Sequence, residues 1–593
     1  MSTNHASTTR SNSSIAEAAT VHALLNCYDR DTDGTERTVA DAVGLSGEFP
    51  VLHCPLSALG VELAVELRYD SPTGRHLLAL PVYLRGTDDW TPVSYTTVAS
   101  CLCQQLEAER DGVNRTDDLL GRIIQSCQNV ARYVGASDSA LGLEPSFRAA
   151  EQSLTFGHLL HPTPKSRIGI TPDEAPTFAP ELGGSFQLTY VAADPSIVAH
   201  DSARETTAPA WVRQQLDPSI LPDDDSIVIP MHPWQARRCR SQPAVQTAIE
   251  AGELSYLGQH GPDFYPTSSV RTLYSPDAPF MVKGSLHVEI TNSLRTNKRP
   301  ELERGVAIAE LLQTEFGEQL ESQFPAFEIV RDPAYLTLDI GSGQESGFEV
   351  VLRDNPFDES TTAMPVVALC QDHPDSGHLG GPDERARSLL SEIITSIADR
   401  EDRSRAAVSL DWFDQYCDVL VRPVVWLLLE HGLGLEAHQQ NSVLELEDGY
   451  PVRGYYRDNQ GYYFAESTYE AIDTYLPGVG DRAQTICRDG VVDERIRYYL
   501  FCNNVFGVIN AFGTAGLIEE RRLLERLAEV LSALTAFDRE TSTLLDELLE
   551  HPTLPCKANL LTRVHDMDEL EGSIDAQSVY TQIDNPLWEV DNQ

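Results

Sequence analysis

The sequence predicts a mixed α+β protein of several domains, in which helical segments flank a strand-rich middle. Its 593 residues exceed what one hydrophobic core usually organises, and typical domain sizes suggest about three or four domains. Apolar residues recur at helical spacing near both ends of the chain, whereas short alternating stretches bounded by Pro and Gly dominate the middle. We therefore expect the chain to divide into the segments 1–14, 15–150, 151–385 and 386–593.

The first 150 residues should form a mainly helical domain that follows a disordered tail. Residues 1–14 are rich in Ser, Thr and Asn and contain no apolar run. The stretches VASCLCQQLEAER and LLGRIIQSCQNVARYV have helical periodicity, and VELAVELRYD is an alternating segment. We expect residues 15–150 to be a mixed domain in which helices predominate.

Strands should dominate residues 151–385, and helices should return in 386–593. The stretches SFQLTYVAAD, FMVKGSLHVEI and GFEVVLRD alternate or are apolar over strand length. Residues 371–386 combine Gly, Pro, Asp and His, and are the best candidate for a loop or boundary. Beyond them, long helical patterns surround a hairpin whose turn is the Asp-Gly pair at 448–449.

Composition excludes some partners. The chain has 90 Asp and Glu residues against 44 Lys and Arg, so it should repel nucleic acid and anionic lipid. Lysine occurs four times, and this scarcity together with the spread acid excess resembles proteins of salt-accumulating halophiles. Such a chain should keep lysine where an ammonium does what a guanidinium cannot. The four are Lys165, Lys283, Lys298 and Lys557, and all but Lys298 lie in segments that attract attention for other reasons.

Cysteine usage and hydropathy predict a soluble cytoplasmic protein. The eleven cysteines include no CxxC pair, so we expect reduced thiols, mostly in the core. The N-terminus has no apolar run of a signal peptide, and the longest apolar stretch, VLVRPVVWLLL, is short and interrupted by Arg-Pro.

The hairpin around 448–449 carries polar side chains at its open end. A symmetric register places His438 opposite Asp458 and Asn441 opposite Tyr456. Carboxylate and amide oxygens held together suit a hard cation such as Mg²⁺. The residues that should gather there are Glu436, His438, Asn441 and Asp458. The alternative is a hairpin whose polar end is simply solvated.

A second hairpin, in PTSSVRTLYSPDAPFMVKGSLHVEIT, should carry a cationic face. A register centred on Asp277 places Arg271 opposite Lys283 and Ser269 opposite Ser285. Two like charges directly opposite destabilise a sheet, so an anion such as phosphate is the natural bridge between them. Alternatively, acidic residues from elsewhere neutralise the pair.

Three further segments could bind anions. Thr291 and Arg295 follow a strand end, where mixed sheets place ligands, and the forked donors of Arg295 suit a carboxylate. The loop GHLLHPTPKSRIGI contains His161 and Lys165, and its histidines with His232 could alternatively bind zinc. The segment HPTLPCKANLLTRV contains Lys557 and could close over a bound anion. The chain contains none of the GxxxxGK[ST], GxSxG, HExxH or Rossmann fingerprints.

Together these segments resemble the aerobactin-synthetase-like (IucA/IucC) family of siderophore synthetases that work independently of non-ribosomal peptide synthetases. The resemblance covers roughly residues 150–565. Its motifs are GH-x-x-HP-x-x-K-x-R-x-G from Gly157, HPWQ from His232, TSS-x-R-T from Thr267 with K-x-SL from Lys283, ITNS-x-R from Ile290, and EAH-x-QN from Glu436 with Arg457-Asp458. The chain departs from the family at Leu159-Leu160, where many relatives have Pro, and at Asn504, where relatives often have His.

The resemblance implies a cupped-hand fold of three domains with a kinase-like C-terminal hairpin. It implies an enzyme that adenylates a carboxylate of citrate or a citryl monoamide with ATP and Mg²⁺, then condenses the acyl group with an amine or hydroxyl. That nucleophile would belong to a polyamine or an N-hydroxy-diamine. Relatives are often dimers, which implies a homodimer here.

The resemblance also implies roles for individual residues. Phosphate binding falls to Ser269, Arg271 and Lys283, with His161 or Lys165 assisting. The carboxylic acid would be held by Thr291, Arg295 and His438. The residues implied for Mg²⁺ and nucleotide are Glu436, Asn441 and Asp458. The candidate catalytic groups are Arg271, Lys283, Arg295 and His438.

Two other functions compete with this one. A kinase-like phosphotransferase would also use an Asn, a hairpin and a metal-binding Asp in that order. Kinases, however, have a catalytic Asp two residues after the loop His, and this chain has Gln440 there. A non-catalytic acidic binding protein would leave the sparse lysines without a shared site.

Overall fold

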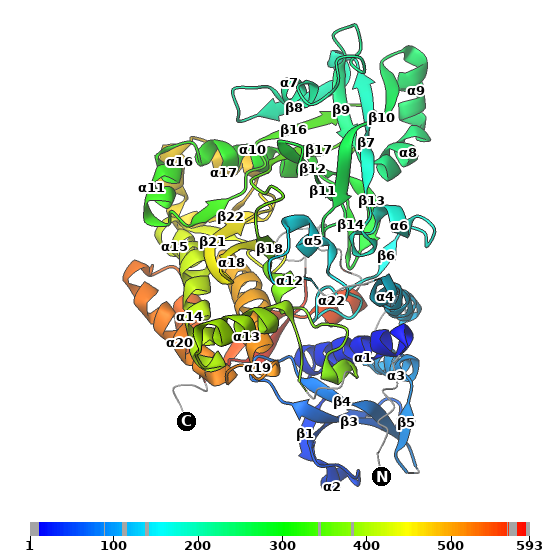
Figure 1. The fold of residues 1–593 in the computed structure, drawn as a ribbon, viewed down its shortest axis with the longest axis vertical. Helices are drawn as coiled ribbons and strands as arrows, with labels where there is room; N and C mark the ends of the chain where they lie inside the picture. Colours follow the sequence, from blue (N-terminus) through cyan, green and yellow to red (C-terminus); the bar gives the residue numbers. More distant parts are fainter. Residues whose placement is uncertain are drawn as a thin grey trace.

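The computed structural model describes residues 11–87, 89–109, 116–136, 141–341, 345–380, 385–565, 567 and 578–588. It confirms a mixed helix and sheet architecture. In the view of Figure 1 the N-terminal elements lie at the bottom, the largest sheet lies at the top, and the C-terminal helices lie to the left. No described helix is both long and apolar enough to cross a membrane. All eleven cysteines are free.

The N-terminal part contains more sheet than its sequence indicates. Five antiparallel strands pair in chain order: β1 (Glu36–Val39), β2 (Pro50–Leu56), β3 (Val61–Tyr69), β4 (Leu77–Arg85) and β5 (Thr91–Val93). They pack against three long helices, α1 (Asn12–Asp31), α3 (Tyr95–Ala108) and α4 (Thr116–Ala136). The short helix α2 (Ala40–Val43) follows β1. In β4 the buried residues are flanked by half-buried apolar ones, which hides the alternation typical of a strand.

The predicted tail of residues 1–14 is partly wrong. Helix α1 begins at Asn12, and Ser11 caps it by accepting a hydrogen bond from the backbone N–H of Ser14. Residues 12–14 are therefore helical. Residues 1–10 lie outside the described part of the chain.

The middle of the chain forms an eight-stranded sheet with the order β8-β16-β17-β12-β11-β10-β7-β9. Its strands are β7 (Phe186–Ala193), β8 (Val198–Ser202), β9 (Ile227–Met231), β10 (Leu254–Pro266), β11 (Thr272–Tyr274), β12 (Phe280–Gly284), β16 (Ala334–Leu338) and β17 (Val350–Asp354). A small sheet continues from it and joins β6 (Arg167–Ile168), β13 (Leu286–Ile290) and β14 (Ser293–Arg295). The main helices of this region are α5 (Phe147–Gln152), α7 (Ala208–Arg213), α8 (Pro233–Arg240), α9 (Pro243–Ala251), α10 (Arg299–Leu311) and α11 (Glu315–Gln323).

A four-stranded sheet joins segments from both sides of residue 385. Its order is β15 (Phe327–Ile329), β21 (Tyr450–Tyr456), β20 (Ser442–Glu447) and β18 (Ala363–Pro365). A three-stranded sheet follows from β19 (Leu433–Leu435), β22 (Tyr462–Ala465) and β23 (Ile486–Cys487). The candidate loop at 371–386 contains one turn of 3₁₀ helix, Gly377–Leu379, and its residues 381–384 lie outside the described part.

The C-terminal helices build the largest core of the molecule. They are α12 (Val366–Cys370), α13 (Leu389–Glu401), α14 (Arg405–Tyr416), α15 (Arg422–His431), α16 (Tyr469–Tyr475), α17 (Val479–Ala483), α18 (Asp489–Ile496), α19 (Phe506–Thr514), α20 (Glu520–Leu534), α21 (Leu544–Glu550) and α22 (Asn559–Val564). Two π-helical segments, η4 (Cys417–Val421) and η6 (Arg497–Val505), interrupt this series. Near the end of the chain β24 (Thr553–Lys557) pairs with β25 (Tyr580–Asp584).

Candidate active site

A cavity of about 800 Å³ lies where the three parts of the chain meet. Its walls come from the loop at 157–167, the β11 and β12 strands, the β13–β14 turn, the open end of the β20–β21 hairpin, η6 and β24. Eleven predicted site residues line this one cavity: His161, Lys165, Ser269, Arg271, Lys283, Thr291, Arg295, Glu436, His438, Asn441 and Asp458. Segments up to about 300 residues apart in sequence thus meet as the patterns predict.

The cavity is strongly cationic although the chain is strongly acidic. Twelve Arg and Lys residues line it among the described residues, against three carboxylates, Glu301, Glu436 and Asp458. All four lysines of the chain are among them, including Lys298, which lies in none of the segments predicted to bind a ligand. The formal net charge of the whole chain is −46. Because low-dielectric walls focus such a field, the cavity should concentrate polyanions.

For the hairpin of β11 and β12, the second one considered in the sequence, the predicted cationic face is found, but the predicted register is wrong by one residue. Lys283 pairs with Thr272, and Arg271 lies opposite Gly284, to which it is joined by a backbone hydrogen bond of 3.2 Å. The predicted alternation fails because Val270 has φ of 67°, which turns the chain before β11 begins. Arg271 and Lys283 nevertheless both face the cavity.

Acidic residues partly neutralise this pair, as the alternative interpretation predicts. Lys283 forms an ion pair with Asp458, and Arg353 lies 4.0 Å from the same carboxylate. Burial lowers the pKa of Lys283 to about 8, with Arg271 and Arg353 adding to the effect and Asp458 opposing it. The pKa of Asp458 falls far below its usual value because Lys283, Arg353 and Arg271 outweigh its burial.

Asn297, which sequence reasoning missed, orients Arg271. It is fully buried, and its Oδ1 accepts a 2.6 Å hydrogen bond from Arg271 Nη1. Its Nδ2 donates to the Lys283 carbonyl at 3.2 Å, while Gln460 donates to the same Oδ1 at 3.2 Å. This amide therefore holds the Arg271 guanidinium and the Lys283 backbone, two of the predicted phosphate-binding residues. The sequence feature that could have drawn attention to Asn297 is the polar run TNSLRTN, which ends at this residue.

The β20–β21 hairpin also departs from a symmetric register. Pairing is symmetric at Glu447 and Tyr450, but a bulge at Val452 shifts it, so that Ser442 faces Tyr456. Asn441 therefore pairs with Arg457, whose N–H donates to its carbonyl at 2.9 Å, rather than with Tyr456. His438 precedes the strand, because β20 begins at Ser442.

Backbone strain is concentrated in these segments. Val270, Thr291 and Asp458 are non-glycine residues with φ of 67°, 56° and 96°. Such conformations cost on the order of 1–3 kcal/mol each and persist where surrounding structure enforces them, as at binding sites. The strain at two β-branched residues and one aspartate places Arg271, Arg295 and Asp458 at the cavity wall.

The candidate carboxylate-binding residues lie as a group. Arg295 Nη2 donates to Thr291 Oγ1 at 3.1 Å and to the Ile290 carbonyl at 3.2 Å. Backbone N–H groups of Gln440 and Asn441 donate to His438 Nδ1 at 3.2 and 3.3 Å, which leaves the ring proton on Nε2. Burial lowers the pKa of His438 to about 4. This histidine is therefore a neutral hydrogen-bond donor near pH 7.

Lys165 has an internal partner, and the zinc alternative is wrong. Glu181, buried behind the cavity, binds both Lys165 and Arg167 at 2.5 Å. His232 caps helix α8 by accepting from the Trp234 N–H and packs against Phe178 and Phe186. Among the described residues, no group of three or more His, Cys, Asp or Glu side chains could hold a metal ion.

The donors proposed for Mg²⁺ have the right chemistry. Glu436 accepts from the Tyr463 hydroxyl, and burial raises its pKa. Asn441 donates its Nδ2 to the Glu436 carbonyl at 3.1 Å, which commits the amide nitrogen and leaves Oδ1 as its ligand atom. Two carboxylates and one amide oxygen fit a cation that takes its remaining ligands from water and phosphate.

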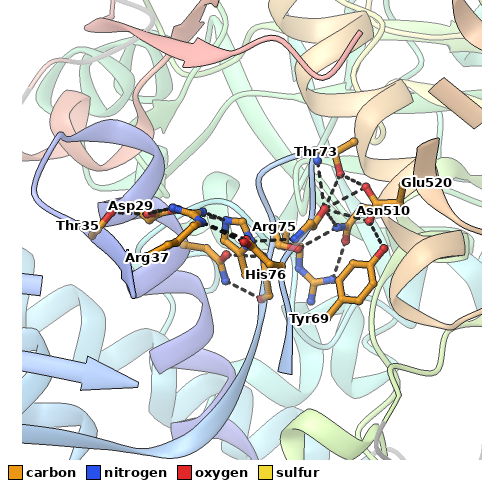
Figure 2. A network of polar contacts seen from close by, with 12 residues as sticks. Asp29, Thr35, Arg37, Tyr69, Thr73, Arg75, His76, Asn510 and Glu520 are labelled. Atoms are coloured by element: carbon orange, nitrogen blue, oxygen red, sulfur yellow. Dashed lines mark hydrogen bonds and ion pairs between the residues drawn. The ribbon is translucent and has the colours of Figure 1, made fainter. Parts of the chain in front are cut away.

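The N-terminal part contributes to the site, although no motif there indicated it. The connection between β3 and β4 supplies Thr73 and Arg75 to the cavity wall. Figure 2 shows them in a polar network that includes Glu520, which accepts from Thr73 Oγ1 at 2.8 Å, and Asn510, which accepts from Arg75 at 3.2 Å. The network holds the N-terminal sheet against α19 and α20.

Comparisons with known proteins agree with this arrangement. Residues 146–371 match the model of the IucA / IucC family, and residues 410–572 match that described as ferric iron reductase FhuF-like transporter. The chain is 43% identical to the spermidine-citrate ligase of Bacillus anthracis, over 97% of this chain and 98% of that protein. It is 36% identical to the rhizobactin siderophore biosynthesis protein RhbC of Rhizobium meliloti (strain 1021), over 97% and 98%.

A solved structure extends the likeness to the whole fold. ATP-bound aerobactin synthetase IucA, from a hypervirulent pathotype of Klebsiella pneumoniae, superposes with a TM-score of 0.84 and 26% sequence identity. The match covers 96% of this chain and 99% of that one.

Proposed function

This chain belongs to the IucA/IucC family of siderophore synthetases, and from that premise we propose that it adenylates a carboxylate of citrate, or of a citryl monoamide, and passes the acyl group to an amine or hydroxyl. It is an acid-amine ligase of siderophore biosynthesis that uses ATP. The observation that carries the proposal is the cavity in which the scarce lysines and the strained Arg271 segment converge. Both substrates expected there, ATP and a tricarboxylate, are polyanions.

The phosphate end of the cavity is assigned to β11, β12 and the turn before them. Ser269, Arg271 and Lys283 would bind the ATP phosphates, with His161 or Lys165 assisting from the facing loop. Arg271 and Lys283 would draw off negative charge as pyrophosphate leaves, and their fixed positions would make this stabilisation available without reorganisation. Arg353, which contacts the same aspartate as Lys283, joins this group.

Magnesium would be held by Glu436, Asn441 and Asp458, whose oxygens fit it. When bound, the ion neutralises phosphate charge and helps to orient the triphosphate. Asp458 also forms the ion pair that holds the Lys283 ammonium at the cavity wall. The positive φ of Asp458 keeps its carboxylate at the hairpin's open end.

The carboxylic acid would lie against Thr291, Arg295 and His438. The Arg295 guanidinium suits a carboxylate, and the neutral His438 can donate from Nε2 without adding a charge. The nucleophile would be an amine of a polyamine or of an N-hydroxylated diamine, since the relatives include a spermidine-citrate ligase and a rhizobactin biosynthesis protein. We also propose a homodimer as the working form.

The experiment measures the products formed from ATP, Mg²⁺ and citrate at molar KCl, with and without a diamine. Citrate-dependent pyrophosphate is the expected product, and ADP would instead mean a phosphotransferase. Arg271→Ala should lower pyrophosphate release at least about 100-fold, because a charge that acts on the transition state is lost. Near-wild-type release by that variant would contradict the assignment of Arg271.

A further inference from the structure

Two cysteines and one arginine from three separate elements meet under the cavity. Arg30, in the last turn of α1, donates a hydrogen bond from Nη2 to Cys556 Sγ on β24. Cys502, in η6, lies within hydrogen-bonding reach of the same sulfur. Cys556 is fully buried, while Cys502 is 4% exposed and lines the cavity. Neither cysteine has a role in the proposed ligase reaction.

The guanidinium favours a thiolate at Cys556. Burial alone would raise the pKa of this thiol, but the hydrogen bond from Cys502 and the charges of Arg30 and Arg497 lower it below its usual value. The pKa of Cys502 is raised, because its proton is held against Cys556 and its sulfur is buried. The contact with Arg30 thus favours the proton on Cys502 and a nucleophilic sulfur at Cys556.

This environment differs from that of the other buried thiols. Burial raises the pKa of Cys27, Cys54, Cys239, Cys370 and Cys417, so these remain protonated. Cys370 provides a direct comparison, since it also lines the cavity but its pKa is raised by burial despite the charge of Arg75. Cys556 is activated as a thiolate and lies behind Cys502, which faces the cavity. A small oxidant can therefore reach the pair through the cavity.

We propose that Cys502 and Cys556 form a peroxide-sensitive dithiol, a modification site that closes to a disulfide. The Cys556 thiolate attacks one oxygen of hydrogen peroxide, the O–O bond breaks, and hydroxide leaves and is protonated to water. Cys502 then attacks the resulting sulfenic sulfur, and a second water leaves as the disulfide forms. Two thiols are oxidised and one peroxide is reduced to two waters.

The disulfide has a structural consequence. It ties η6, which carries Tyr498, Tyr499 and Asn503 into the cavity, to β24, which carries Lys557. It also removes the anionic partner of Arg30 and leaves a buried cation facing a neutral disulfide. The inference does not depend on the ligase activity and can be tested without substrates.

The test titrates the reduced full-length protein with hydrogen peroxide, blocks remaining thiols by alkylation and maps the peptides by mass spectrometry. We expect a Cys502–Cys556 cross-link to appear before modification of the other nine cysteines and to disappear with dithiothreitol. The proposal fails if both thiols remain open to alkylation while other cysteines oxidise.

Variants at Arg30 test whether its charge activates Cys556, or whether the two cysteines react only because they lie close together. Arg30→Gln should slow disulfide formation at neutral pH by about tenfold, whereas Arg30→Lys should stay within about threefold of wild type. An unchanged rate in a folded Arg30→Gln protein would overturn the proposal. Cys370→Ala is the matched control, and its cross-linking rate should equal that of wild type. In Cys502→Ala, a sulfenic acid at Cys556 should be trapped by dimedone instead.

Discussion

At the scale of single residues, Lys283 is the group whose charge should set the pH range of ATP binding. Its pKa is lowered to about 8, and the ammonium form is the one that binds phosphate. Raising the pH through about 8 therefore removes the charge. We expect kcat/KM for ATP to be flat below this pH and to fall about tenfold per unit above it.

The Lys283→Arg variant is the control for this pH profile. A guanidinium stays protonated throughout the range, so the alkaline limb should move above pH 9 or vanish, whatever the effect on the maximal rate. The measurement is initial-rate pyrophosphate release at subsaturating ATP, because kcat/KM reports the free enzyme. An unshifted limb in the variant would assign it to another group.

Asn297 should act by positioning Arg271. We expect Asn297→Ala to lower kcat for pyrophosphate release by about 10- to 100-fold while KM for citrate changes little, because the guanidinium loses its orienting acceptor but keeps its charge. Asn297→Asp keeps an acceptor oxygen and should be less impaired than Asn297→Ala. Equal losses in both variants, with normal thermal stability, would argue against a positioning role.

At the scale of elements, the sequence predicted which segments meet but not their registers. The motif segments and turns were correct because Asp448-Gly449 and the polar strand ends are local signals. The registers were wrong by one because of a bulge at Val452 and a positive φ at Val270. Valine normally avoids such conformations, so nothing in the local sequence predicts either feature. The predicted site residues nevertheless line one cavity, since a single-residue shift keeps the strand ends together.

Asn504 shows how a residue behind the cavity wall supports that wall. It is fully buried in η6, donates to the Ala437 carbonyl at 2.8 Å and Ser442 Oγ at 2.9 Å, and accepts from the Tyr416 hydroxyl at 3.0 Å. It therefore holds the segment that contains His438, although relatives often have His at this position.

We expect Asn504→Ala to lower the free energy of unfolding by about 2–4 kcal/mol, because it leaves buried polar partners unsatisfied. Urea denaturation at fixed salt measures this loss. The surface amide Gln104, which donates a 3.2 Å hydrogen bond to Ser100 Oγ, gives the control Gln104→Ala with a change below about 0.5 kcal/mol. Similar stability of the two variants would contradict the bracing role.

At the scale of the whole molecule, the surface and the cavity carry opposite charge. The N-terminal network of Thr73, Arg75, Asn510 and Glu520 was invisible to sequence analysis, because its partners are more than 400 residues apart and form no motif. The acid excess, by contrast, was readable from composition alone. That the cavity is cationic despite this excess could be learned only from the fold.

Salt should therefore have two opposite effects. Added KCl screens repulsion within the acidic chain, so the melting temperature should rise from low to molar salt. The same screening weakens attraction of ATP to the cationic cavity, so KM for ATP should also rise. Thermal scans and ATP titrations over one KCl series measure both, with sucrose as an uncharged comparison. A KM for ATP that falls with salt while the protein stays folded would contradict this electrostatic reading.

Because every lysine of the chain lies in the cavity, covalent labelling of lysine reports on the occupancy of this site. Amine-directed footprinting reagents can react with only four side chains, and all four line the cavity. Labelling of the intact protein, followed by peptide mapping that separates the four lysine peptides from the one labelled at the α-amino group, would therefore read site occupancy. Each protected lysine would identify the wall that a nucleotide, an acid or an amine covers.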